Sequence, residues 1–186
     1  MNLKAIVPER VSMPAKMFLA ATTLNGFGNG ILNVVMLLYF SSLGFDSAAI
    51  GTVLMMTPIS TVLLTIPSGI LADRYGLKKM LLVILFPMGL STLLLLTAKS
   101  VEIFMFAFLV QGIVEASAGV ILGPLYSTFF DAKDMDKAFG LQGFLNLITV
   151  SVGSLMGFVP PMLVASYGYS LQAAYWTLVA IALVFF

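Results

Sequence analysis

The stretch Gly69-Ile-Leu-Ala-Asp-Arg-Tyr-Gly-Leu-Lys-Lys-Met-Leu81 places one acid and three cations between two long apolar runs. Charges are scarce in the rest of the chain, since only 9% of the 186 residues are charged and 60% are hydrophobic. Such a chain has too much apolar surface for a water-soluble domain. We therefore interpret the stretch as the polar connection between two membrane-spanning helices.

Six apolar runs approach or exceed the roughly 20 residues that a helix needs to cross about 30 Å of hydrocarbon. They cover residues 18–43, 48–71, 80–97, 101–129, 138–164 and 171–186. The sequence therefore predicts an all-α transmembrane bundle of six helices. The sixth run would rise only about 24 Å as a helix, so we expect this chain to be the N-terminal half of a longer protein, truncated in its last helix.

The cations predict the orientation of the bundle. If the six spans alternate in direction, eight of the nine lysines and arginines lie on the side of the N-terminus, and only Lys99 lies on the other. Loops rich in Lys and Arg remain in the cytoplasm. We therefore expect a multi-pass protein of the cell (inner) membrane, with the N-terminus and the loops at 72–79 and 131–137 in the cytoplasm.

Composition also excludes some classes of partner and chemistry. The net charge is +1 without a basic tract, which argues against a nucleic-acid partner. The chain has no cysteine and no histidine, so it lacks thiolate ligands and Ser-His catalysis. Asp131, Asp134 and Asp136 alternate with lysines, which favours a solvated mixed-charge loop over a metal site. No cofactor and no metal is expected.

Two pairs of short patterns recur in the chain: Asn25-Gly26-x-x-Asn29 with Gln111-Gly112-x-x-Glu115, and Leu71-x-x-x-Tyr75-Gly76 with Leu163-x-x-x-Tyr167-Gly168. They predict two three-helix repeats, at 18–97 and 98–186, after an N-terminal segment at 1–17. An odd number of spans per repeat inserts the second copy upside down, which gives an inverted repeat. Chance matches in a biased composition are the alternative.

Pairs of glycines one turn apart predict close helix contacts, because small residues let backbones approach one another in lipid. The pairs are Gly26 with Gly30, Gly119 with Gly123, and Gly153 with Gly157.

The opening stretch resembles the signature that the major facilitator superfamily carries between its second and third helices, G-x-L-A-D-R-x-G-R-K-x-x-L. The matching residues are Gly69, Leu71, Ala72, Asp73, Arg74, Gly76, Lys78 and Leu81, whereas Leu77 stands at the second arginine. The resemblance implies one half of a twelve-helix transporter, whose C-terminal six-helix half is missing or is a separate chain. It also implies a cytoplasmic gate at Gly69, Asp73, Arg74, Gly76 and Lys78.

Glu115 is the first candidate for a functional residue, because a carboxylate near the middle of a membrane span is costly unless it faces a partner or water. Gln111 lies one turn away on the same face. The segment Phe108-Leu-Val-Gln111-Gly112 resembles the family's fourth-helix motif R-x-x-Q-G, with Phe108 at the arginine position. In proton-coupled relatives this arginine is associated with coupling. The resemblance therefore implies that Glu115, one turn further along, could take its place as the group that binds the proton. The alternative is a protonated glutamate that hydrogen-bonds a neighbouring helix.

Asparagines are the second set of candidates. Asn25, Asn29 and Asn33 form a polar stripe along one helix face, and Asn146 pairs with Gln142 in the fifth span. A polar stripe in lipid points inward, and asparagine suits a neutral polar or mixed ligand. In the family, helices 1 and 4 line the central cavity, which implies that the stripe and Glu115 surround one volume. Interhelical hydrogen bonding is the alternative role.

These features favour a secondary active transporter that moves a small organic solute by alternating access, with the proton as a candidate coupling ion. An amphipathic or cationic solute fits a region with one acid and no cation. A membrane-embedded enzyme and a non-transporting membrane scaffold are the alternatives, and we expect no enzyme.

Overall fold

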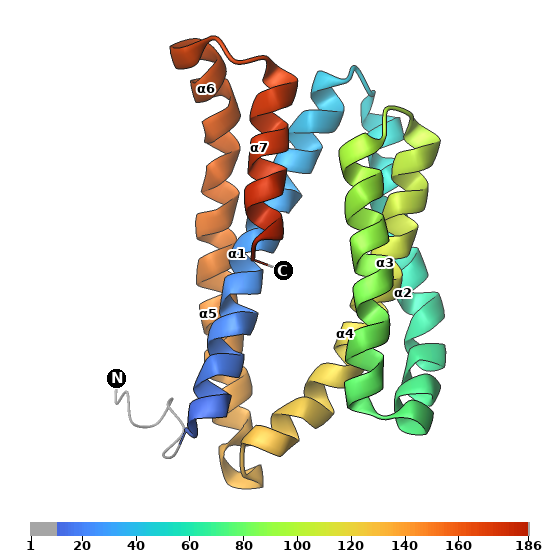
Figure 1. The fold of residues 1–186 in the computed structure, drawn as a ribbon, viewed down its shortest axis with the longest axis vertical. Coiled ribbons are helices and arrows are strands. Elements are labelled where there is room, and N and C mark those ends of the chain that lie inside the picture. Colours follow the sequence, from blue (N-terminus) through green and yellow to red (C-terminus); the bar gives the residue numbers. More distant parts are fainter. Residues whose placement is uncertain (1–10, 186) are drawn as a thin grey trace. The chain divides into compact units, whose positions relative to one another are not determined.

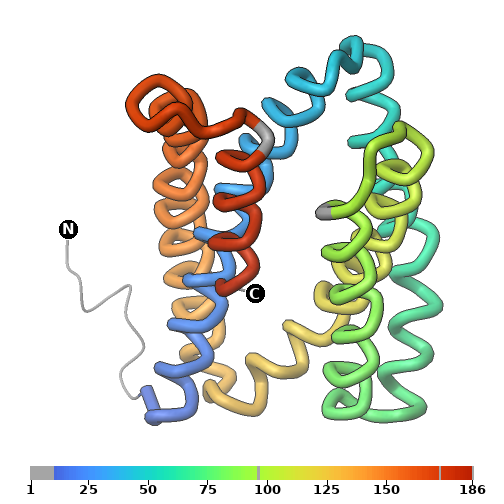
Figure 2. Tube along the Cα trace, turned by 45° about the horizontal axis from the view of Figure 1, so that its top comes forward, coloured from blue at the N-terminus to red at the C-terminus, as the bar shows by residue number. Residues whose placement is uncertain are grey.

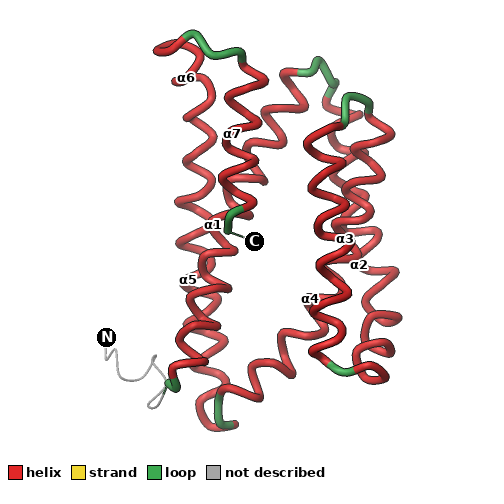
Figure 3. Tube along the Cα trace, in the orientation of Figure 1, coloured by secondary structure: helices red, strands yellow, loops and turns green. Residues whose placement is uncertain are grey.

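The structure, a computed structural model, describes residues 11–185, apart from the side chains of Leu96 and Gln172. These residues form helices and short connections without a strand (Figure 1, Figure 3). The elements are α1 (Met13–Ser42), α2 (Ser47–Tyr75), α3 (Leu77–Thr97), α4 (Val101–Phe129), η2 (Ala132–Asp134), α5 (Met135–Leu155), η3 (Met156–Phe158), α6 (Val159–Tyr167) and α7 (Leu171–Leu183). The predicted all-helical fold is confirmed.

The described residues contain five helical segments that are long and apolar enough to cross a membrane. A shorter apolar helix at Ala173–Leu183 belongs to the sixth predicted span. Large apolar side chains lie on the surface, for example Ile66, Phe86 and Leu147, which are 74%, 77% and 70% exposed. Exposure on this scale fits lipid as the surrounding solvent, and the chain is a multi-pass membrane protein.

The connection between α2 and α3 is much shorter than the predicted loop at 72–79. Asp73 and Arg74 still belong to α2, and only Gly76 separates the two helices. Gly76 has φ +83°, a value that favours glycine, and its N–H donates to the Ala72 carbonyl at 2.8 Å. The prediction was wrong because charges end an apolar run without ending helical hydrogen bonding.

The related pattern at the end of α6 has a similar local structure. Gly168 follows Tyr167 with φ +67°, and its N–H donates to the Val164 carbonyl at 3.1 Å. Both Tyr-Gly patterns therefore end a helix at a glycine with positive φ. The inverted repeat itself stays a prediction.

The fifth predicted span, 138–164, starts earlier, ends later and is interrupted. A 3₁₀ turn at Met156–Phe158 separates α5 from α6. Pro160 has no N–H to donate to the Met156 carbonyl, which accepts instead from the N–H of Val159, three residues on. The two successive prolines, Pro160 and Pro161, thus explain the change of helix type.

The helices form two packing units, each described by itself. The first, called the α1–α5 unit, contains α1, α5, η3, α6, α7 and the last residues of α4; α1 runs beside α5 and α7 (Figure 2). The second, called the α2–α4 unit, contains α2, α3 and α4 to Tyr126.

Glycines bring α1 and α5 into close contact. A Cβ added to Gly30 would collide with the Val150 carbonyl, and one added to Gly153 would collide with the Phe27 carbonyl. The Ser154 hydroxyl also donates to the Gly30 carbonyl at 3.3 Å. Two of the predicted glycine pairs, at 26–30 and 153–157, are thus confirmed as contact positions.

In the α2–α4 unit, a single glycine of α4 makes the close approach. A Cβ on Gly112 would lie 2.5 Å from the Thr57 carbonyl oxygen and 2.5 Å from the Ser60 Cβ. The predicted pair Gly119 and Gly123 is wrong as a contact, because a Cβ at either position would meet nothing within 4 Å among the described residues. The spacing of glycines shows where another helix could approach the backbone. It does not show whether a helix lies there.

Candidate functional site

Glu115 lies midway along α4, and its side chain is exposed. Its carboxyl lies near the Thr61 hydroxyl on α2, and the hydrogen bonds found among the described residues do not include one between these two groups. The Thr61 hydroxyl also contacts two backbone carbonyls, that of Thr57 at 2.9 Å and that of Gly112 at 3.3 Å. Glu115 therefore lies beside the close approach of α2 and α4 at Gly112.

Gln111 is half-buried and points to a different neighbour from Glu115. Its Oε1 accepts a hydrogen bond of 3.0 Å from the hydroxyl of Ser91, a buried residue of α3. Gln111 therefore joins α4 to α3, whereas Glu115 faces α2. The amide nitrogen of Gln111 retains two donors beyond this bond.

The asparagine stripe of α1 begins with a hydrogen-bonded pair. Asn29 Nδ2 donates to Asn25 Oδ1 at 2.9 Å and to the Asn25 carbonyl at 3.1 Å. Both side chains are half-buried, whereas Asn33 is exposed. This bond joins two residues of one helix, and the hydrogen bonds found among the described residues do not include one from either asparagine to another helix. Their remaining amide groups are open to another ligand.

The polar pair of α5 packs against α1. Gln142 Oε1 accepts a hydrogen bond of 2.8 Å from the Thr22 hydroxyl. Asn146 lies over Gly26, where its Nδ2 would be 2.6 Å from an added Cβ. Asn146 thus occupies the space that the absent side chain of Gly26 leaves. The hydrogen bonds found among the described residues do not involve its side-chain amide.

Hydroxyl groups of α2 are the part of the site that the sequence reasoning missed. The Thr57 hydroxyl donates to the Phe108 carbonyl at 2.9 Å, and the Ser68 and Ser117 hydroxyls are 3.2 Å apart. Ser60 is buried beside Gly112. The signal was available, since hydroxyls recur at intervals of three, four and seven along an otherwise apolar helix.

The gate motif consists of a buried apolar part and an exposed charged part. Ala72 and Met80 are packed in a core with Ile84 and Ile121. Asp73 is exposed, and none of the hydrogen bonds and ion pairs found among the described residues involves it. Within the described part of the chain, Asp73 thus pairs with neither Arg74 nor Lys78 and does not cap α3.

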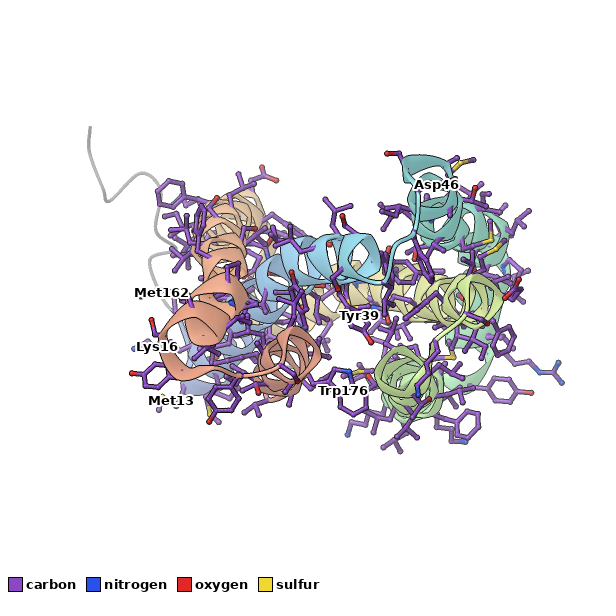
Figure 4. The ribbon with its side chains drawn as sticks, turned by 90° about the horizontal axis from the view of Figure 1, so that it is seen from above. Met13, Lys16, Tyr39, Asp46, Met162 and Trp176 are labelled. Atoms are coloured by element: carbon purple, nitrogen blue, oxygen red, sulfur yellow. The ribbon has the colours of Figure 1, made fainter. Side chains whose placement is uncertain are left out.

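Arg74 and Lys78 are also exposed. The Arg74 guanidinium lies 5.6 Å from the centroid of the Tyr75 ring, a cation–π distance. A different acid, Asp46, is the N-cap of α2 (Figure 4). Its Oδ1 accepts a hydrogen bond of 2.7 Å from the Ala49 N–H.

The acidic segment before α5 differs from the solvated loop that we predicted. Asp134 is buried and forms an ion pair with Lys137 at 3.2 Å, whereas Asp131 and Asp136 are exposed. Burial follows from the 3₁₀ turn, in which the Asp134 N–H donates to the Asp131 carbonyl at 2.9 Å. No group of three potential metal ligands among Asp, Glu, His and Cys occurs in the described residues.

Comparison with known protein families finds a match over most of the chain. Residues 18–186 match the family model described as Major Facilitator Superfamily. A segment of 61 residues is 34% identical to a protein of Bacillus subtilis (strain 168) named "Uncharacterized MFS-type transporter YxaM". The aligned segment covers 33% of this chain and 15% of that relative, so the similarity reaches only a small part of its length.

Proposed function

This chain belongs to the major facilitator superfamily of membrane transporters, and we propose that it forms the N-terminal half of a secondary transporter that moves a small organic solute by alternating access. A C-terminal six-helix half would complete the protein. The N-terminus would lie in the cytoplasm, as the eight-to-one distribution of cations predicts.

We propose that Glu115 binds the coupling proton. The observation that carries this proposal is a carboxyl group midway along a membrane helix, in a unit whose other charged residues lie at helix ends or in the connections. An ionised carboxylate is costly there, so binding and release of a proton are coupled to the access of water. Gln111, one turn away on α4, connects this part of the helix to α3 through its bond to Ser91.

The asparagines of α1 are our candidates for contacts with the solute, together with Asn146 on α5. Amide groups donate and accept, which suits neutral or mixed polar groups of an amphipathic solute. Asn33 is exposed, and Asn25 and Asn29 keep donors and acceptors beyond their mutual bond.

A transport assay tests the role of Glu115. The full-length protein is reconstituted in liposomes with an imposed proton gradient, and uptake of a panel of amphipathic and cationic solutes is measured. Glu115→Gln should reduce gradient-driven uptake by about tenfold or more, the effect of losing about 1.4 kcal/mol. Glu102→Gln is the matched control, since Glu102 lies exposed in the first turn of α4. Equal uptake by both variants would remove Glu115 from the mechanism, and normal transport by a Glu115→Leu variant would also exclude a hydrogen-bonding role of this carboxyl.

Asp73 is proposed as the gate residue that acts on a partner beyond the described residues. Its exposed carboxylate is held at the end of α2, directly before the Gly76 turn. Asp73→Asn should lower uptake while protein amount and thermal stability stay unchanged. Asp131→Asn, at another exposed acid, serves as the control.

A further inference from the structure

We propose that Gln142, oriented by Thr22, is a specificity-determining residue of the solute site, and that it binds a neutral acceptor oxygen of the solute, such as that of a carbonyl or ether group. The inference rests on the proposed transport function and deepens it, because it names the kind of chemical group that the α1–α5 unit takes. It follows from which ends of the side-chain amides are already used by hydrogen bonds within the protein.

Two stripes of polar side chains meet where α1 and α5 pack together. Residues three or four positions apart lie on one face of a helix, so each helix contributes one stripe. The hydrogen bond from the Thr22 hydroxyl to Gln142 Oε1 joins the stripes, and Asn146 lies opposite Gly26. The side chains of both stripes are half-buried and thus partly open to another molecule: Thr22, Asn25 and Asn29 on α1, and Gln142, Asn146 and Thr149 on α5.

The first two asparagines of α1 are oriented by a backbone group. Asn29 Nδ2 lies 3.1 Å from the Asn25 carbonyl, which only accepts hydrogen bonds, so the nitrogen end of Asn29 must face it. The same nitrogen donates to Asn25 Oδ1 at 2.9 Å. Asn25 therefore uses its side-chain oxygen within the helix, and the hydrogen bonds found among the described residues leave both N–H donors of its Nδ2 unused.

Gln142 is oriented by a residue of the other helix. Its Oε1 accepts a hydrogen bond of 2.8 Å from the Thr22 hydroxyl, whose oxygen also lies 3.0 Å from the Phe18 carbonyl and 3.1 Å from the Leu19 carbonyl. Among the described residues, no other group bonds to the Gln142 amide, so its Nε2 keeps two donors. Thr22 is thus a positioning residue, and Gln142 is the residue that contacts the solute.

These donors occur in helices without charged side chains. Residues 17–45 and 138–185 contain no Asp, Glu, Lys or Arg. An N–H donor repels a cationic group, and these helices offer no lysine or arginine to offset the desolvation of an anion. Amide donors without an acceptor are costly within a membrane. A neutral oxygen acceptor is therefore the solute group that fits Gln142.

NMR spectroscopy of the full-length protein in lipid nanodiscs, with 15N-labelled glutamine, tests this contact without transport. The side-chain amide signal of Gln142 is the one that disappears in Gln142→Met. Two probes of similar size are titrated: N,N-dimethylbenzamide, which only accepts hydrogen bonds, and benzylammonium, which only donates them. We expect the first probe to shift the Gln142 amide protons downfield until the site is saturated, and the second to leave them unchanged. Any other result, including no shift with either probe, would overturn the inference.

Variants of Thr22 test the orientation of the amide. Thr22→Val removes the hydroxyl and keeps the shape, so the Gln142 amide can turn. The affinity for N,N-dimethylbenzamide should fall about tenfold, the effect of losing one oriented hydrogen bond. Benzylammonium should then begin to shift the Gln142 signal, which a merely structural role of Thr22 would not cause. Thr22→Ser should restore the wild-type behaviour.

Thr149→Val is the matched control for this substitution. The Thr149 hydroxyl lies at the same seam, but it donates only along its own helix, to the Leu145 and Asn146 carbonyls. Wild-type binding in Thr22→Val, or the same change in Thr149→Val, would exclude the positioning role of Thr22.

Uptake measurements separate this inference from the proposed function. Gln142→Glu replaces the donors by acceptors at nearly constant shape, so N,N-dimethylbenzamide should no longer compete with a solute that the protein transports. If uptake proceeds while the Gln142 signal ignores both probes, this inference fails and the proposed function stands. If the signal responds as expected while no solute is moved, the proposed function fails and the binding site stands.

Discussion

Some glycines of this protein lie directly against a backbone carbonyl of a neighbouring helix. Gly153 lies against the Phe27 carbonyl, and Gly112 lies against the Thr57 carbonyl. At both places a hydroxyl of the helix pair donates to a nearby carbonyl, from Ser154 to Gly30 and from Thr61 to Gly112. Close approach and hydroxyl bonding thus occur together, because only a missing side chain lets a short hydroxyl reach across.

Gly153→Ala should destabilise the α1–α5 unit by about 1–3 kcal/mol, because its Cβ has to displace backbone rather than a side chain. Gly119→Ala is the control and should be neutral or stabilising by up to about 1 kcal/mol, since open space surrounds it and Ala favours a helix. Thermal unfolding in detergent, followed by the fluorescence of the single tryptophan, Trp176 on α7, measures both (Figure 4). Equal melting temperatures of the two variants would contradict this prediction.

The ion pair before α5 leads to a second prediction at this scale. Lys137→Met leaves the buried Asp134 carboxylate without its cation and should destabilise the protein by about 1–3 kcal/mol. Lys133→Met, at an exposed lysine of the same segment, should change stability by less than about 0.5 kcal/mol. The same thermal unfolding experiment compares them, and a larger effect at Lys133 would argue against the structural role of the pair.

Among the elements, the break between α5 and α6 has the clearest mechanical consequence. A 3₁₀ turn rotates each residue by about 120° instead of about 100°, so three residues turn the following helix by about 60°. The face that α6 presents to its surroundings therefore depends on Pro160 and Pro161.

Replacing both prolines by alanine should restore a continuous α-helix and rotate α6 back by about 60°. These 186 residues contain no cysteine, so single cysteines can be placed at each position of 162–166 without labelling elsewhere in this part of the protein. Their labelling by a water-soluble thiol reagent should show a different periodic pattern with and without the prolines. An identical pattern would show that the turn has another cause.

The sequence predicts the existence of the helices better than it predicts where each helix ends and which helices pack against one another. The apolar runs locate the helices, with α5 and α6 in a single run, but they cannot detect that Asp73 and Arg74 continue α2, because a charged residue does not by itself end a helix. Glu115 is conspicuous in an apolar helix, whereas its neighbour Thr61 is one of many hydroxyls. Which helix lies opposite depends on tertiary packing, and no local pattern encodes it.

At the scale of the whole molecule, topology remains the property to be tested. Ser42, Lys78, Lys99 and Lys133 are all exposed at or near the ends of helices, so a cysteine at each position can be labelled. Labelling from outside intact cells should mark positions 42 and 99, and labelling after permeabilisation should add positions 78 and 133. Any other order would contradict the proposed orientation.

The two packing units also relate to the predicted repeat. If α1 corresponds to α4, α2 to α5 with α6, and α3 to α7, each unit contains the counterparts of the other's helices. Gly26 of α1 faces α5, and Gly112 of α4 faces α2, as such an exchange requires. This agreement supports the inverted repeat as a prediction.

The division of the chain has a consequence for biosynthesis. The α2–α4 unit is continuous in sequence, whereas α1 packs mainly on α5 and α7, whose residues are made more than a hundred positions later. During synthesis α1 enters the bilayer before α5 and α7 have been made, with the backbone at Gly26 and Gly30 uncovered. A ribosome that stalls after α4 would leave that surface open to other membrane helices, and α1 is where chaperone assistance or quality control would act.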